Sequence, residues 1–325
     1  MTLTSPCKIR KAAPIRIGVL STALLSFFCI FLLFKNPEAA IEYVTRGLHI
    51  ATGTVIPALF PFMVLSELIV SGALGNVCFF LRPLCRLLHL STVGGCSYLL
   101  GILCGAPIGA RCLVAAYRQG SIEKRECEYL LGLSTIPSSA FLINAVGVLL
   151  WESSRLGLIL FLCPLLSSLL LTLLIFGRAK ANTSHTSSFS LCRRERGATL
   201  FASAIKECTS ALLSVTAYVV FFSVVTGTLE LILRPLSLPP SFRAYLSSLL
   251  EISDGMSRIS ALEHTKPAAM LCAFAAGWGG LSVHCQVLSV CDGSGLSLRP
   301  YFILKAGTAL LSTIVMFLLL ILFPL

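Results

Sequence analysis

The sequence predicts an all-α polytopic membrane protein with about seven transmembrane helices and two re-entrant hairpins, arranged as an inverted repeat with discontinuous helices at its centre. Three observations lead to this prediction. The 325 residues are 56% hydrophobic and only 12% charged, with a mean hydropathy of +0.90. Apolar runs of about 18 residues or more, the length of a membrane-spanning helix, recur along the chain. Glycine, proline and polar residues interrupt four apolar segments, two in each half of the chain.

The charge and the cysteines exclude several other classes of protein. The net charge of +11 would suggest a nucleic-acid partner in a soluble protein, but in a membrane protein it reflects basic cytoplasmic loops. The fourteen cysteines are dispersed, without a Cys-x-x-Cys pair, so neither a metal site nor a redox pair is expected. The sequence contains no phosphate loop, nucleophile elbow, His-Glu-x-x-His motif or dinucleotide fingerprint. We therefore expect no enzyme activity, catalytic residue, cofactor or nucleic-acid partner.

Residues 1–40 are predicted to form a cytoplasmic N-terminal segment and a first transmembrane helix. The basic stretch "KIRKAAPIR" precedes an apolar run at 17–34, which places the N-terminus inside. The following "KNPEAAIEY" is a poor cleavage site, so the helix is expected to stay attached. A cleaved signal peptide is the alternative.

The other full-length apolar segments are expected to cross the membrane as helices. They lie at about 54–71, 129–150, 156–177, 209–233, 267–291 and 301–325. The segment 178–208 is the one clear hydrophilic break, rich in Ser and Thr, with six basic and two acidic residues. We therefore predict a basic cytoplasmic linker at 178–208 between two repeats, 41–177 and 209–325.

Two further stretches, 93–117 and 243–262, fit re-entrant hairpins better than full crossings. Glycine and proline interrupt the first, and the second is too polar to cross and carries "SDG" at its middle. If each enters and leaves the membrane on one side, 18 of the 25 Lys and Arg residues lie inside, as the positive-inside rule requires. A full crossing at 93–117 would place the basic linker outside.

The two halves then repeat one order of elements: helix, hairpin, interrupted helix, helix. They enter the membrane from opposite sides. Short echoes support the repeat, because "SELIV" contains Glu67 where "LELIL" contains Glu230, and "LRPL" occurs at 81–84 and at 233–236. An inverted repeat with discontinuous helices is typical of secondary transporters, whose binding sites lie at mid-membrane between the repeats.

Four breaks in the apolar segments form the predicted binding site. They read "CGAPIGA" at 104–110, "STIPSSA" at 134–140, "EISDGMS" at 251–257 and "GWGGLSVH" at 277–284. Non-helical backbone at membrane depth is tolerated only where protein or a watery cavity satisfies it, and the free N–H groups at half-helix N-termini attract anions. For the glycines, close helix packing is the alternative. The predicted substrate-binding residues are Gly105, Pro107, Gly109, Arg111, Thr135, Ser138, Ser139, Asp254, Gly255, Gly277, Gly280, Ser282, His284 and Gln286.

Three of these side chains have a specific predicted role and a plainer alternative. Arg111 is expected to be a fixed positive charge near an anionic ligand, or else an anchor at the membrane interface. His284 is expected to donate to a substrate carboxylate or to relay a proton, or else to form a hydrogen bond between helices. Asp254 precedes a glycine and is expected to bind a ligand or a coupling ion, or else to make a turn.

Three glutamates are the candidates for coupling to an ion. Glu251 lies in the second predicted hairpin tip. Glu67 and Glu230 lie four to five residues from the predicted ends of their helices, so both side chains are also long enough to reach the interface. No metal site is expected.

The motifs resemble those of the YlbJ-type sporulation integral membrane proteins, a family of the nucleoside-recognition or Gate domain superfamily. The resemblance covers roughly residues 10–320, through "VIPALFPFMVLSELI" (55–69), "GAPIGA" (105–110), "LLEISDG" (249–255) and "GWGGLSVHCQVLSV" (277–290). The last motif is the most specific. Two departures concern the substrate: "TIPSSA" stands where relatives have an Asn-rich break, and "AP" replaces the usual "YP" at 106–107.

The resemblance implies a multi-pass protein of the bacterial inner membrane, located in the outer forespore membrane during sporulation, that moves dipicolinic acid toward the forespore. The expected partners are this small anionic solute, the lipid bilayer and other sporulation membrane proteins. Opposed half-helix N-termini with Arg111 and His284 suit a flat dianion with two carboxylates. Two alternatives stay open: a nucleoside or nucleobase transporter, and a membrane scaffold for spore-envelope assembly that does not transport.

Overall fold

The computed structural model describes residues 26–27, 30–31, 33–177 and 198–323. Most of the described residues are helical, and no strand occurs among them. Five of their helices are long and apolar enough to cross a membrane, or six if one bent pair forms a single span. This composition supports an all-α polytopic membrane protein. The predicted first helix at 17–34 and most of the linker 178–208 lie outside the described residues.

A helix begins soon after the first predicted span. The helices α2 (Pro37–Ile50), η1 (Ala51–Val55, a π-helical turn) and α3 (Ile56–Leu87) follow one another without a loop. Pro37 fits the first turn of a helix, where its missing N–H costs nothing. The helix α2 packs on α8 (Ala198–Leu233).

Glycines make the contact between α2 and α8 close. The Tyr43 ring covers Gly227 of α8, where an added Cβ would lie 2.3 Å from the ring. Gly47 faces Ser223 in the same way, with an added Cβ 2.9 Å from the serine side chain. The helix α2 is therefore closely packed against α8.

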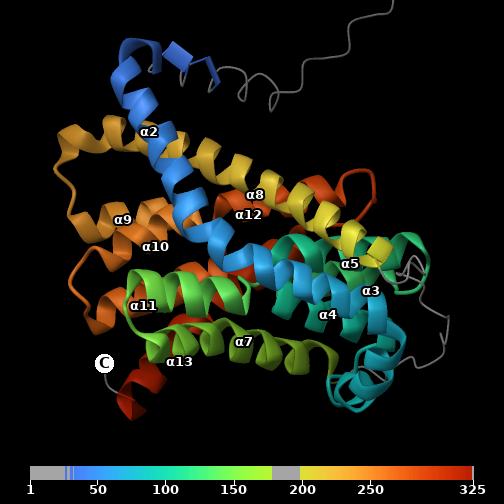
Figure 1. The fold of residues 1–325 in the computed structure, drawn as a ribbon. Coiled ribbons are helices and arrows are strands. Elements are labelled where there is room, and N and C mark those ends of the chain that lie inside the picture. Colours follow the sequence, from blue (N-terminus) through green and yellow to red (C-terminus); the bar gives the residue numbers. More distant parts are fainter. Residues whose placement is uncertain (1–25, 28–29, 32, 178–197, 324–325) are drawn as a thin grey trace, which may run out of the picture.

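Next in the chain come two short helices that fold back on each other, α4 (Thr92–Cys104) and α5 (Ala106–Arg118). The turn between them is Gly105, with φ +92° and ψ 175°, a conformation that requires glycine. A Cβ on Gly109 would lie 2.5 Å from the Cα of Gly101, so the two backbones touch. Residues 92–118 are therefore a helical hairpin and not one straight helix (Figure 1).

The remaining elements give the two halves the same order. In the first half the hairpin leads to α6 (Lys124–Ser134), a non-helical break, the π-helix η2 (Ala140–Leu150) and α7 (Ser154–Phe176). In the second half α8 leads through the short η3 (Arg234–Leu236) to α9 (Pro240–Leu250), α10 (Ile252–Ser260), α11 (Lys266–Trp278), α12 (Gly280–Cys291) and α13 (Arg299–Leu322). The predicted interrupted helix at 129–150 therefore consists of two helices, α6 and η2, on the two sides of the break. The opposite entry of the two halves into a bilayer stays a prediction.

The second hairpin and the second broken helix are also built around glycine. Gly255 of α10 packs on α9, where an added Cβ would lie 2.2 Å from the Cα of Ser248. Gly279 and Gly280 have φ values of +91° and +81°, and they separate α11 from α12. Helices therefore end at all four predicted breaks.

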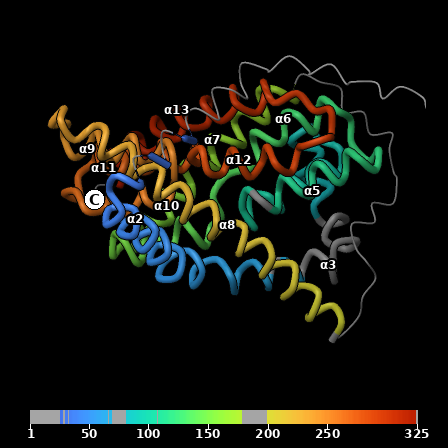
Figure 2. The backbone as a smooth tube through the Cα atoms, turned by 90° about the horizontal axis from the view of Figure 1, so that it is seen from above, coloured from blue at the N-terminus to red at the C-terminus, as the bar shows by residue number. Residues whose placement is uncertain are grey.

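The broken elements lie inside the bundle, with long helices around them. Figure 2 shows α8 and α2 along one side and α13 with α7 along the other, and α12 between them. The helix α13 contacts both α11 and α6, the leading pieces of the two broken helices. Gly277 allows this approach, since an added Cβ would lie 2.5 Å from the Cα of Ala309. This packing holds the breaks in the interior.

We expect Gly105→Ala to lower the thermal unfolding midpoint of the detergent-purified protein by several degrees. An alanine at φ +92° is strained by about 1–3 kcal/mol, and its Cβ would also lie 3.3 Å from that of Ser138. Gly53→Ala is the matched control, because Gly53 lies in a helical turn with open space around it, and its midpoint should stay level or rise. Equal midpoints for the two variants would contradict the hairpin turn at Gly105.

Candidate functional site

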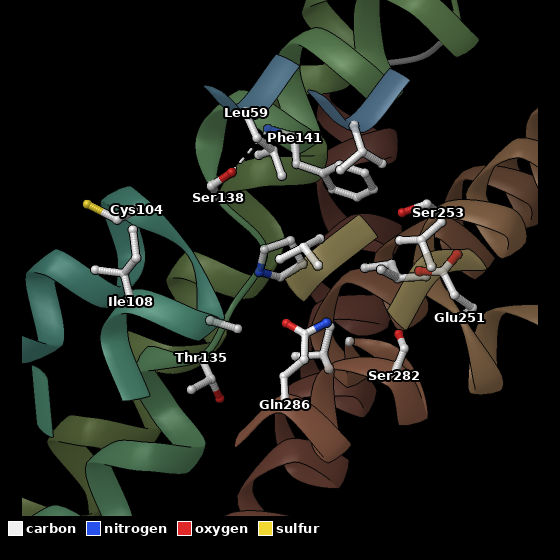
Figure 3. A pocket seen from close by; sticks show the side chains of 18 of the residues that line it. Leu59, Cys104, Ile108, Thr135, Ser138, Phe141, Glu251, Ser253, Ser282 and Gln286 are labelled. Carbon is white, nitrogen blue, oxygen red and sulfur yellow. Dashed lines mark hydrogen bonds between the residues drawn. The ribbon is translucent and has the colours of Figure 1, made fainter. Parts of the chain in front are cut away.

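A single pocket collects residues from all four helix breaks. Its polar lining comes from Thr135, Ser138, Glu251, Ser253, Ser282 and Gln286. Cys104 and Ala106, on either side of the first break, complete the set. The cavity volume is about 80 Å³, enough for several water molecules or a small solute. The Gln286 side chain points into the cavity (Figure 3).

The rest of the lining is mostly apolar, and part of it comes from the long helices. Leu59 and Met63 of α3, together with Val215 and Val219 of α8, close one side of the pocket. Phe141 of η2 adds an aromatic ring. An apolar wall with a few convergent polar groups is the usual form of a small-molecule site.

Four helix N-termini begin at this pocket, and two of them have no side-chain cap. The Ser138 hydroxyl accepts a hydrogen bond from the Phe141 N–H (3.2 Å), at the start of η2. The Glu251 carboxylate accepts one from the Asp254 N–H (2.6 Å), at the start of α10. In contrast, α5 and α12 start after glycines that cannot cap them. Their N–H groups carry the partial positive charge of a helix N-terminus toward the pocket.

The structure brings together several of the predicted binding residues. Thr135, Ser138, Ser282 and Gln286 line the pocket. Gly105 and Gly280 do not line it but make the turns beside it, both with positive φ. Pro107 lies in the first turn of α5.

Other predicted residues serve packing, which was the alternative for the glycines. Gly109, Gly255 and Gly277 each face a neighbouring backbone too closely for any side chain. Ser139 is half-buried at the start of η2 and is not part of the pocket lining.

The two predicted cationic ligands, Arg111 and His284, are not part of the pocket lining. Arg111 is exposed on α5. His284 is fully buried, and its Nδ1 is 2.6 Å from the Tyr301 hydroxyl on α13. The imidazole is surrounded by the rings of Trp278, Tyr301 and Phe302. For His284 the structure therefore shows the hydrogen bond between helices that was the alternative.

Asp254 and Glu230 belong to a network of ion pairs behind the second hairpin. Arg258 Nε donates to the Asp254 carboxylate (2.7 Å), and the guanidinium also pairs with both oxygens of Glu230 on α8. Arg46 of α2 lies 3.0 Å from the second Asp254 oxygen. The network joins α10 to α8 and α2. Of the three coupling candidates, Glu251 lines the pocket, while Glu67 is half-buried in α3 outside its lining.

Sequence reasoning missed Lys305 and Gly279. Lys305 of α13 is fully buried, and its Nζ donates to the Thr135 carbonyl (2.9 Å). From sequence alone, a lysine six residues from the start of a helix is expected to lie near the membrane interface and to reach water. The available signal was a charge inside an apolar span, which usually faces the protein interior. Gly279 also lines the pocket. It was omitted because the helix break was assigned to its neighbour Gly280.

The chain is similar to the sporulation integral membrane protein YlbJ of Bacillus subtilis (strain 168). The two sequences are 24% identical over 326 residues, which is 88% of this chain and 79% of the relative. No family model and no solved structure matches the chain. The similarity confirms the predicted YlbJ-type resemblance. With the apolar helices, it supports a sporulation-associated, multi-pass integral membrane protein.

We expect Arg258→Met to destabilise the protein much more than Arg46→Met. Arg258 is 14% exposed and holds two carboxylates, one of them 1% exposed, so its removal should cost up to about 3–5 kcal/mol. Arg46 is 38% exposed, and solvent screens its pair to about 0–1 kcal/mol. Both variants lose one positive charge, and thermal unfolding in detergent compares them. Equal shifts of the unfolding midpoint in the two variants would contradict a stabilising role of this network.

Proposed function

We propose that this YlbJ-type protein is a secondary transporter that moves a small carboxylate by alternating access. The main candidate for the solute is dipicolinic acid, and the membrane is the outer forespore membrane. One observation carries the proposal: residues of four separate helix breaks line one pocket. Irregular backbone at membrane depth is tolerated where it lines a cavity, and transporters bind solutes between such half-helices. A protein that only served as a scaffold would not need polar groups inside its helix bundle.

The uncapped N-termini support a carboxylate as the solute. The N-terminus of α5 lies in the first half of the chain and that of α12 in the second, and both reach the pocket through Ala106 and Ser282. Each offers backbone N–H groups and partial positive charge to an anion. Dipicolinate has one carboxylate on each side of its ring nitrogen, in the plane of the ring, so each N-terminus would receive one carboxylate. This is the arrangement that an inverted repeat would provide.

Three lining residues favour a second candidate, a nucleoside or nucleobase carrier. The Glu251 carboxylate and the Gln286 amide match the hydroxyl and amide groups of a nucleoside, and the Phe141 ring offers a stacking surface. A carboxylate in the pocket would also repel a dianion. However, the Asp254 N–H and the N-terminus of α10 offset part of the Glu251 charge.

Uptake into proteoliposomes tests the proposed site. We expect Gln286→Leu to reduce the uptake of labelled dipicolinate at least tenfold, since a buried polar contact of about 1.5–3 kcal/mol is lost at similar volume. Arg111→Ala should leave uptake near the wild-type level, because Arg111 is exposed and outside the pocket lining. Rates are normalised to the amount of reconstituted protein.

Ligand-dependent stability of the purified wild-type protein separates the candidate functions. Dipicolinate should raise the unfolding midpoint and uridine should not. The reverse result favours the nucleoside carrier. If neither solute binds, and variants at the breaks behave as wild type while deletion of 178–208 abolishes sporulation, the scaffold role is favoured.

For Glu251 we expect a role in coupling rather than in the affinity for the solute. Glu251→Gln keeps an acceptor for the Asp254 N–H and removes the charge, so dipicolinate binding should persist or tighten. Uptake driven by a proton or sodium gradient should fall to the rate of passive exchange. Glu251→Ala is the comparison, because it also loses the α10 cap and should unfold about 1 kcal/mol more easily. Unchanged gradient-driven uptake in the Gln variant would remove Glu251 from the coupling role.

A further inference from the structure

We infer that Lys305 is the residue that selects a dicarboxylate over a monocarboxylate in the pocket, by pairing with one carboxylate of the solute. This inference rests on the proposed transport of small carboxylates and adds a residue that determines specificity. It starts from the position of the ammonium group, which no sequence motif had indicated.

The ammonium lies directly behind two residues of the pocket wall. Its Nζ is 2.9 Å from the carbonyl oxygen of Thr135, the C-cap residue of α6. A Cβ on Gly279, the C-cap residue of α11, would lie 3.6 Å from the same Nζ. Both Thr135 and Gly279 line the pocket. Lys305 therefore stands where the two broken helices meet, and Gly279 places no side chain between the ammonium and the cavity.

The surroundings of Lys305 leave its charge without an acidic partner. The side chain is 0% exposed. No Asp or Glu in the described parts of the chain forms an ion pair with it. An ammonium has three N–H donors, and the structure gives one hydrogen bond, to Thr135. Buried charges in proteins are normally paired, because an isolated one is costly.

A bound carboxylate would supply the missing partner. The C-terminal ends of α6 and α11 carry partial negative charge and favour a cation at this point, but they offer only backbone carbonyls. A solute carboxylate near Ser282, in the first turn of α12, would meet that helix N-terminus on one side and the ammonium on the other. A solute with a single carboxylate can occupy either this position or the one at α5, whereas a dicarboxylate fills both.

Titration calorimetry with two pyridine acids tests the inference on the full-length, detergent-purified protein. The probes are pyridine-2,6-dicarboxylate, which is dipicolinate, and pyridine-2-carboxylate. Wild-type protein should bind the dicarboxylate about 10- to 100-fold more tightly, the range of one charge-assisted hydrogen bond. Lys305→Met should reduce this ratio to within about threefold, mainly through weaker dicarboxylate binding.

Two further variants make the result decisive. Lys305→Gln keeps a donor for the Thr135 carbonyl without the charge, so it should fold normally and also lose the preference. Lys266→Met removes an exposed lysine at the start of α11 and should keep the full preference. If wild-type protein binds neither acid, the proposed function fails. If it binds the dicarboxylate and both Lys305 variants keep the wild-type ratio, the inference on Lys305 is overturned while the proposed function stands.

Discussion

The hydrogen-bonding needs of interrupted backbone are the constraint on which this fold depends. Every helix break inside a bilayer exposes N–H and C=O groups that lipid cannot satisfy. The structure meets this constraint by gathering all four breaks at one place, where side chains satisfy some groups and a cavity borders the rest. Ser138 and Glu251 cap two N-termini, and Lys305 binds a carbonyl at the end of α6. A solute in the pocket would meet the uncapped N–H groups at the starts of α5 and α12.

The two hairpins are held in different ways, although their order in the chain is the same. The first hairpin is held by backbone contact, since Gly101 and Gly109 let α4 and α5 touch. The second also packs on a glycine, but Arg258 further ties α10 to α8 through Glu230. Ion pairs are directional and exchange partners more readily than a close-packed glycine contact. If one hairpin moves during transport, the second has the contacts that allow two discrete positions.

The breaks were predictable from sequence because glycine, proline and turn residues have local causes that act without knowledge of the fold. The helix at Pro37 was not predicted, because its packing on α8 through Tyr43 and Gly227 cannot be read from the local sequence. Likewise, Arg111 and His284 were placed by their distance from a break along the chain. Whether a side chain points into the pocket depends on the rotation of its helix, which neighbouring helices fix. Lys305 was missed for the same reason, since only the packing of α13 buries it.

The two ionisable residues near the pocket stand at different breaks and have opposite charge. Glu251 belongs to the third break, at a helix N-terminus that stabilises an anion. Lys305 lies between the ends of α6 and α11, where helix C-termini stabilise a cation. Each residue therefore lies at a helix end whose partial charge is opposite to its own. An anionic solute beside Lys305 and a coupling cation beside Glu251 would bring two opposite charges into one small cavity, where each lowers the cost of burying the other. This mutual dependence would couple the proposed solute to an ion.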